Sequence, residues 1–108
     1  MPNDHVLDRL SAIVAARKGA DAGTSYTAKL LQDGVQRCAK KFGEESVETV
    51  IAAVSGTKEA VIAESADVLY HLLVLWAACG VKPDEVYAAL AAREGRSGLE
   101  EKASRQTS

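Results

Sequence analysis

Residues 60–79 read AVIAESADVLYHLLVLWAAC and decide the fold, because the helix that they predict is apolar on nearly every face. A helix that is hydrophobic all round is normally buried among other helices. Its ionisable side chains are Glu64, Asp67, Tyr70, His71 and, at the far end, Cys79. Burying an unpaired carboxylate costs roughly several kcal/mol. We therefore expect these acids to be paired, protonated or bound to a metal ion.

A second group of acids lies on the preceding helical segment, where residues 43–48 read GEESVE and contain Glu44, Glu45 and Glu48. Residues three or four apart share one face of a helix, so each group of acids points one way.

The turn signal between the two segments is Gly56. An antiparallel hairpin about this glycine pairs Glu48 with Glu64 and Glu45 with Asp67, so four carboxylates converge at one level. Like charges at that distance repel strongly unless a cation lies between them. A hard divalent cation suits such a set of oxygen ligands.

The rest of the chain also predicts helices, and no segment alternates as a strand does. Capping and turn residues place the expected helices from Asn3 or Asp4 to Lys18, from Thr24 or Ser25 to Gly34, over 35–54, from Thr57 to Gly80, and from Pro83 onward. We expect an all-α bundle of about five helices in a single domain, residues 1–108, with a tail over 95–108 that could be flexible.

The composition of the chain limits the kinds of partner that we expect. A chain of 108 residues with 47% hydrophobic residues has little material to cover so apolar a helix, which favours completion of the core by homodimerisation. The net charge of −2 gives no general attraction to nucleic acid or to an anionic membrane. The N-terminus lacks a signal pattern, and the apolar run 68–81 is short for a membrane span. We expect a cytoplasmic protein.

The residues around the acids indicate phosphate chemistry. Oxygen ligands without a Glu-x-x-His pair favour magnesium or manganese over a di-iron site. Lys29, Lys40 and Lys41 lie near the acids along the chain and are suited to phosphates. The reaction would be attack of a metal-activated water on phosphorus. His71 could bind substrate, orient a carboxylate or pack as a hydrogen-bonded core histidine, and the core role is favoured.

These motifs resemble a known family. Glu44-Glu45-x-x-Glu48 followed by Glu64-x-x-Asp67 is similar to the paired motif of the MazG-type all-α nucleotide pyrophosphohydrolases. The segments 25–31 (SYTAKLL), 64–74 (ESADVLYHLLV) and 93–102 (REGRSGLEEK) resemble the branch of this superfamily that works in histidine biosynthesis. The likeness spans most of the chain from Ser25 onward.

The resemblance implies a homodimer that hydrolyses phosphoribosyl-ATP to phosphoribosyl-AMP and pyrophosphate with magnesium. By motif, the implied metal ligands are Glu45, Glu48, Glu64 and Asp67. Glu44 is implied either as a further ligand or as the group that positions the attacking water, so that Glu44, Glu45 and Glu48 form the catalytic set. Lys29, Lys40, Lys41 and Arg96 are the implied phosphate contacts.

Three other interpretations stay open. A related pyrophosphohydrolase that removes non-standard or deoxynucleoside triphosphates would share the acids, without needing the 25–31 segment or the tail. A non-catalytic helical dimerisation module would carry the acids as surface charge and would bind no metal. An iron-carboxylate bundle is disfavoured by the missing Glu-x-x-His pair.

Overall fold

The computed structural model describes residues 5–95 and residue 105, and within that part of the chain it is a bundle of five α-helices without strands. The helices are α1 (Val6–Arg17), α2 (Tyr26–Asp33), α3 (Val35–Ser55), α4 (Lys58–Cys79) and α5 (Pro83–Ala91). The predicted all-α fold is confirmed, and the predicted helix bounds hold to within one or two residues.

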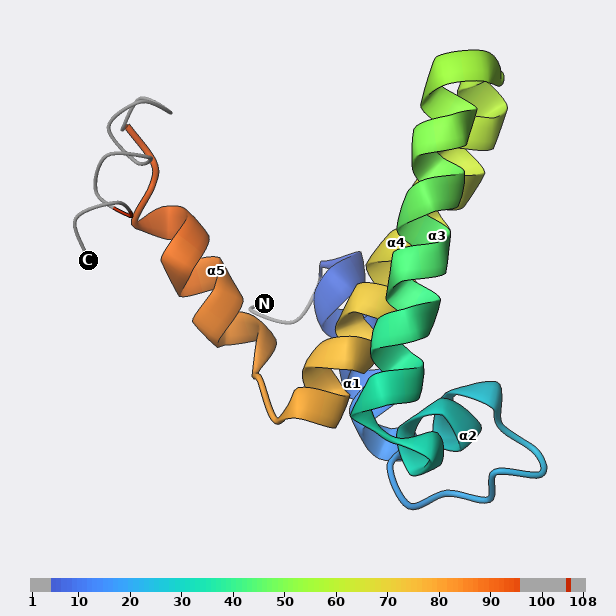
Figure 1. Cartoon of the computed structure of the whole chain (residues 1–108). Coiled ribbons are helices and arrows are strands. Elements are labelled where there is room, and N and C mark those ends of the chain that lie inside the picture. The colour runs from blue at the N-terminus through green and yellow to red at the C-terminus, as the bar shows by residue number, and fades with distance from the viewer. Residues whose placement is uncertain (1–4, 96–104, 106–108) are drawn as a thin grey trace.

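Helices α3 and α4 form a long antiparallel hairpin that dominates the molecule (Figure 1). The hairpin turns at Gly56, as predicted, where the Gly56 N–H donates to the Ala52 carbonyl at 2.8 Å. A Cβ at Gly56 would lie only 2.8 Å from that same carbonyl oxygen, so the turn requires glycine. Thr57 then begins α4, since its hydroxyl accepts from the Ala60 N–H at 3.1 Å.

The other helix ends follow local signals. Ser25 caps α2 by accepting from the Ala28 N–H at 3.1 Å. Gly34, with φ +97°, both ends α2 and begins α3, and Gly80, with φ +74°, ends α4 in the left-handed region. The predicted first caps, Asn3 and Asp4, lie outside the described residues. In the structure His5 caps α1 instead, because its Nδ1 accepts from the Leu7 N–H at 3.1 Å.

The core of the single chain is small and lies where α1 and α2 pack against the hairpin, away from its turn. Its centre takes one side chain from each of the first four helices: Val14, Leu30, Cys38 and Val74. The Cys38 thiol donates to the Leu30 carbonyl at 3.2 Å, which ties α3 to α2. Helix α5 leaves the end of α4 and runs away from the bundle (Figure 1).

Much of the apolar surface of the hairpin is exposed in the single chain. The large apolar side chains that are more than half exposed on its two helices are Val47, Val50, Ile51, Val54 and Ile62. By length and composition α4 could cross a membrane, and 17% of its most apolar stretch is buried inside the chain. One such helix is weak evidence for a membrane, because the mostly buried core helix of a soluble protein passes the same test of length and composition.

Candidate functional site

Three carboxylates converge between α3 and α4, about half-way along the hairpin. Glu45, Glu48 and Glu64 each offer one oxygen, and the three oxygens lie within 4.8 Å of one another. The Thr49 hydroxyl lies close to the carbonyl oxygens of Glu45 on its own helix (2.9 Å) and of Glu64 on the facing helix (3.2 Å), so it can donate to either. This contact fixes the register of the hairpin at the level of the acids.

The hydrogen bonding of Glu45 and Glu64 is incomplete within the described part of the chain. Oε2 of Glu45 and Oε2 of Glu64 are buried and have no hydrogen-bond partner among the described residues. Hydrogen bonding to the Glu48 carboxyl, burial, and the charges of Glu48 and Asp67 raise the pKa of Glu45 to about 7. A cation would stabilise the ionised form of all three groups, so the donor set fits a hard divalent metal ion.

Asp67, the fourth expected ligand, stands beside this group and not within it. Its charge contributes to the raised pKa of Glu45, so it lies within electrostatic range of the cluster. Its side chain is exposed and its oxygens are outside the set of three that converge. Asp67 lies one helical turn after Glu64 on α4, so the two residues share one face of that helix.

An open cavity of about 450 Å³ leads to the acids. It is lined by Lys41, Glu44, Glu45, Val47 and Glu48. The Lys41 ammonium lies 3.4 Å from Oε1 of Glu44, and the Tyr26 hydroxyl and then Glu44 raise the pKa of Lys41. A charged lysine therefore lines the same cavity as the acids.

Lys29 and Lys40, two other expected phosphate contacts, do not line this cavity. Lys29 lies on α2, where its ammonium is 3.6 Å from Asp33 in an exposed pair one turn apart. Lys40 is exposed on α3, next to Lys41 in sequence, and it does not line the acidic cavity. Arg96 lies outside the described residues. Of the three expected basic residues that the structure describes, Lys41 is the one that lies with the acids.

His71 adjoins the cluster, and its burial agrees with the core role that the sequence favoured. Its side chain is buried, and its Nε2 lies 3.8 Å from Oε1 of Glu45. Burial, followed by the charge of Lys41, lowers the pKa of His71, so the imidazole is neutral at pH 7. The contact is therefore between a neutral ring and a carboxyl group and is not an ion pair. The spacing of His71 from Asp67, one turn, was the available signal.

Two tyrosines surround this histidine. The ring of Tyr70 meets it edge to face at a centroid distance of 4.9 Å, and the ring of Tyr26 does so at 6.3 Å. The Tyr70 hydroxyl shares a hydrogen bond with the Thr27 hydroxyl, which ties α4 to α2. Tyr26 is half exposed beside Lys41, so an aromatic side chain also borders the site.

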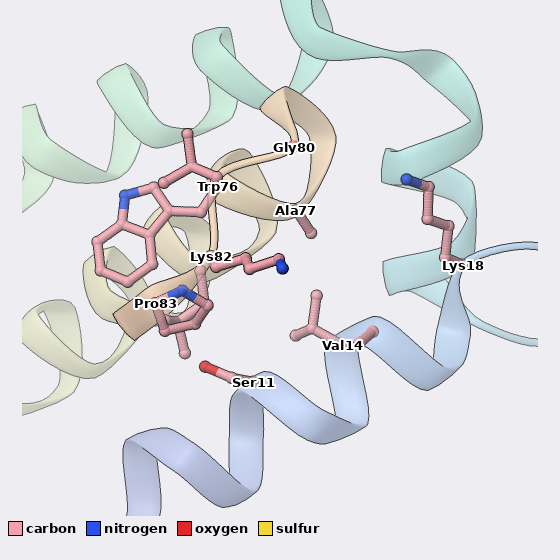
Figure 2. Close-up of a pocket in the computed structure, with 11 residues that line it drawn as sticks. Ser11, Val14, Lys18, Trp76, Ala77, Gly80, Lys82 and Pro83 are labelled. Carbon is pink, nitrogen blue, oxygen red and sulfur yellow. The ribbon is translucent and has the colours of Figure 1, made fainter. Parts of the chain in front are cut away.

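A second cavity, of about 300 Å³, lies between α1, the end of α4 and the start of α5 (Figure 2). Its wall is mainly apolar, with Val14, Trp76 and Pro83 prominent, and the Ser11 hydroxyl points toward Pro83. Among the described residues, two lysines, Lys18 and Lys82, and no acidic residue line it. The carboxylate chemistry therefore belongs to the first cavity.

Comparison with known proteins agrees with this geometry. Residues 7–94 match the family model described as phosphoribosyl-ATP pyrophosphohydrolase. A protein of Parvibaculum lavamentivorans named phosphoribosyl-ATP pyrophosphatase is 68% identical over 99 residues, which cover 92% of this chain and 91% of that protein. Two further proteins have the same name. The one from Azorhizobium caulinodans is 60% identical, and the match covers 100% of both chains. The one from Paramagnetospirillum magneticum is 57% identical, and the match covers 93% of this chain and 92% of that protein.

Proposed function

The chain belongs to the phosphoribosyl-ATP pyrophosphohydrolase family, and from that membership we propose that it hydrolyses the α–β phosphoanhydride of phosphoribosyl-ATP. The products are phosphoribosyl-AMP and pyrophosphate, in the second step of histidine biosynthesis. The observation that carries the proposal is the convergence of three carboxylate oxygens within 4.8 Å at the end of a cavity with a lysine at its rim.

The proposed cofactor is Mg²⁺, with Mn²⁺ as a substitute. Glu45, Glu48 and Glu64 would hold the ion, with Asp67 as a fourth ligand after rotation of its side chain. The two buried carboxylate oxygens without partners support this assignment, because a bound cation would supply the missing interaction. When bound, the ion supplies Lewis-acid stabilisation of the negative charge that develops on the phosphates.

The residues at the rim have separate roles in this proposal. Glu44 is half exposed and outside the converging set, which favours positioning of the attacking water over metal ligation. The water oxygen bonds to the α-phosphorus and gives up a proton to the solvent, the bond from that phosphorus to the bridging oxygen breaks, and pyrophosphate leaves with the electron pair of that bond. Lys41 neutralises charge on the departing phosphates. Lys29, Lys40 and Arg96 are further proposed phosphate contacts.

We also infer that the functional form is a cytoplasmic homodimer without nucleic-acid or membrane partners. The apolar side chains exposed on α3 and α4 support a second copy as the covering surface, because contiguous exposed apolar surface marks an interface. This surface begins at Val47, which also lines the acidic cavity. A partner subunit would therefore lie close to the acids and could complete the substrate site.

Release of pyrophosphate from phosphoribosyl-ATP tests the proposal, measured with Mg²⁺, with excess chelator, and beside a panel of ordinary and deoxynucleoside triphosphates. Release confined to phosphoribosyl-ATP and abolished by chelator is the expected result. Release from the panel instead would assign the chain to the nucleotide clean-up reaction. Folded protein that releases pyrophosphate from no substrate would overturn the proposed activity.

A further inference from the structure

We propose that His71 is a positioning residue that holds the Glu45 carboxylate in its metal-binding orientation. The inference rests on the proposed function, because the metal is the one that the three carboxylates would hold. It assigns a role to a buried histidine that the reaction does not itself require. His71 reaches no reacting atom and acts through Glu45.

The first observation is the geometry between the two side chains. His71 is 5% exposed, so its ring is held inside the protein, and its Nε2 lies 3.8 Å from Oε1 of Glu45. Hydrogen bonds of this kind have donor–acceptor distances of about 2.7–3.2 Å, so a movement of about 1 Å by the carboxylate would close the contact. Polar contacts in sites without their ligand are often long in this way and tighten on binding.

The second observation selects the tautomer of His71. A neutral imidazole carries one N–H, at either Nδ1 or Nε2. Nδ1 is buried and has no hydrogen-bond partner among the described residues, so a proton there would be a buried donor without an acceptor. A proton on Nε2 instead faces the Glu45 carboxylate. The surroundings therefore favour the Nε2–H tautomer, which can donate to Glu45.

The third observation is the frame that fixes the ring. Tyr70 contacts His71 edge to face at an interplanar angle of 73°, and Tyr26 does so at 88°. The hydrogen bond between the hydroxyls of Tyr70 and Thr27 anchors one of these tyrosines to α2. A ring between two aromatic neighbours has little freedom to turn, so Nε2 stays directed at Glu45.

The consequence for the metal site concerns the two oxygens of Glu45. A hydrogen bond from His71 engages Oε1 and leaves Oε2, which is buried and without a protein partner, free to ligate. A residue that orients a metal ligand by a hydrogen bond typically contributes about 10- to 100-fold to metal affinity or activity. His71 would thus link the packing of α2 and α4 to the strength of metal binding.

Two amide variants separate this role from simple packing. The amide nitrogen of His71→Gln lies near the position of Nε2, whereas that of His71→Asn lies near the position of Nδ1. Mn²⁺ affinity is measured by electron paramagnetic resonance on the full-length protein without substrate, and kcat and KM for phosphoribosyl-ATP are measured alongside. We expect His71→Gln to stay close to the unaltered protein and His71→Asn to bind Mn²⁺ about 10- to 100-fold more weakly.

The outcomes distinguish this inference from the proposed function. If the unaltered protein binds Mn²⁺ and hydrolyses phosphoribosyl-ATP, and His71→Asn binds Mn²⁺ equally well, His71 is only a packing residue and the inference is wrong. If the unaltered protein binds no Mn²⁺, the proposed metal site itself fails. A fall in melting temperature for both variants with unchanged Mn²⁺ affinity would also contradict a positioning role.

A measurement on the unaltered protein covers the case in which His71→Asn does not fold. Nitrogen-15 NMR of the metal-free protein reports which ring nitrogen carries the proton, and the two histidines, His5 and His71, are assigned by the His5→Gln variant. The inference requires a proton at Nε2, from where the ring can donate to Glu45. A proton at Nδ1 alone would overturn it.

Discussion

The two halves of the α3–α4 hairpin are incomplete in opposite ways. At the level of Glu45, Glu48 and Glu64, three carboxylate oxygens converge, and one oxygen each of Glu45 and Glu64 is buried without a hydrogen-bond partner among the described residues. Nearer the turn, Val50, Ile51 and Val54 are more than half exposed, with Val54 at 82%. The first region needs charge of opposite sign, and the second needs apolar cover. We propose that the first region binds a metal ion and that the second packs against a partner subunit, so that both would lie on the same pair of helices.

The largest expected effect is the loss of activity when one of the acids between α3 and α4 is replaced. Glu48→Gln, Glu64→Gln or Asp67→Asn removes one charge and one proposed ligand, and we expect turnover of phosphoribosyl-ATP to fall by roughly 100-fold or more. The rate of pyrophosphate release measures this loss. Glu59→Gln, at the exposed first turn of α4, is the matched control and should retain full activity. Activity retained in the three site variants would show that the acids are surface charge.

A charge in the exposed apolar region near the turn is expected to weaken the proposed dimer. Val54→Asp places a charge on the most exposed large apolar side chain of the hairpin, and burial of an unpaired charge in an interface is strongly unfavourable. We expect the dissociation constant of the dimer to rise by roughly 100-fold or more, measured by sedimentation or light scattering over a concentration series. Ala20→Asp, in the loop between α1 and α2, should leave assembly unchanged. A dimer unaffected by Val54→Asp would place the interface elsewhere.

A substitution at the turn that joins the two helices is expected to lower the stability of the fold. Gly56→Ala would place a methyl group 2.8 Å from the Ala52 carbonyl oxygen, and we expect a loss of about 1–3 kcal/mol in the free energy of unfolding. Gly43→Ala is the matched control inside α3, where a Cβ meets no atom within 4 Å. That variant should gain up to about 1 kcal/mol, because alanine favours a helix interior over glycine. Chemical denaturation measures both, and equal effects would refute the steric argument.

The smallest expected effect is a pH dependence of the metal-free protein. The pKa of Glu45 is raised from 4.5 to about 7, so the stability contributed by its protonated form is present below pH 4.5 and is lost as the pH rises through about 7. His71 acts in the opposite direction, since its lowered pKa removes stability as the pH falls below 6.5. The Glu45→Gln variant isolates the first effect.

With chelator present, the difference in melting temperature between Glu45→Gln and the unaltered protein should grow as the pH rises from 5 to 8. Saturating Mg²⁺ should remove the loss in the unaltered protein, because the ion stabilises the carboxylate form. A difference that stays constant with pH would mean that Glu45 does not titrate in this range.

Features set by local sequence could be predicted. The cap at Ser25, the glycine at Gly34, the turn at Gly56 and the left-handed glycine at Gly80 each depend on a few neighbouring residues. The register of the hairpin followed from the position of Gly56 alone, because two straight helices that meet at one turn pair by symmetry. This is why Glu48 and Glu64 could be placed opposite each other without a structure.

Features set by side-chain orientation could not be predicted. Helical spacing gives the face on which Asp67 lies, but not the rotamer that leaves its oxygens outside the converging set. Lys29 was expected near phosphate, whereas an acid one turn away, Asp33, lies beside it. The approach of His71 to Glu45 depends on how Tyr26 and Tyr70 pack around the ring, which involves α2 as well as the hairpin.

The most direct test of the metal site is the crystal structure of the protein with Mn²⁺, with anomalous scattering used to locate the ion. The account predicts one or more Mn²⁺ peaks between α3 and α4, within coordination distance of oxygens from Glu45, Glu48 and Glu64. Crystals that hold Mn²⁺ only elsewhere, or none at this level of the hairpin, would contradict it.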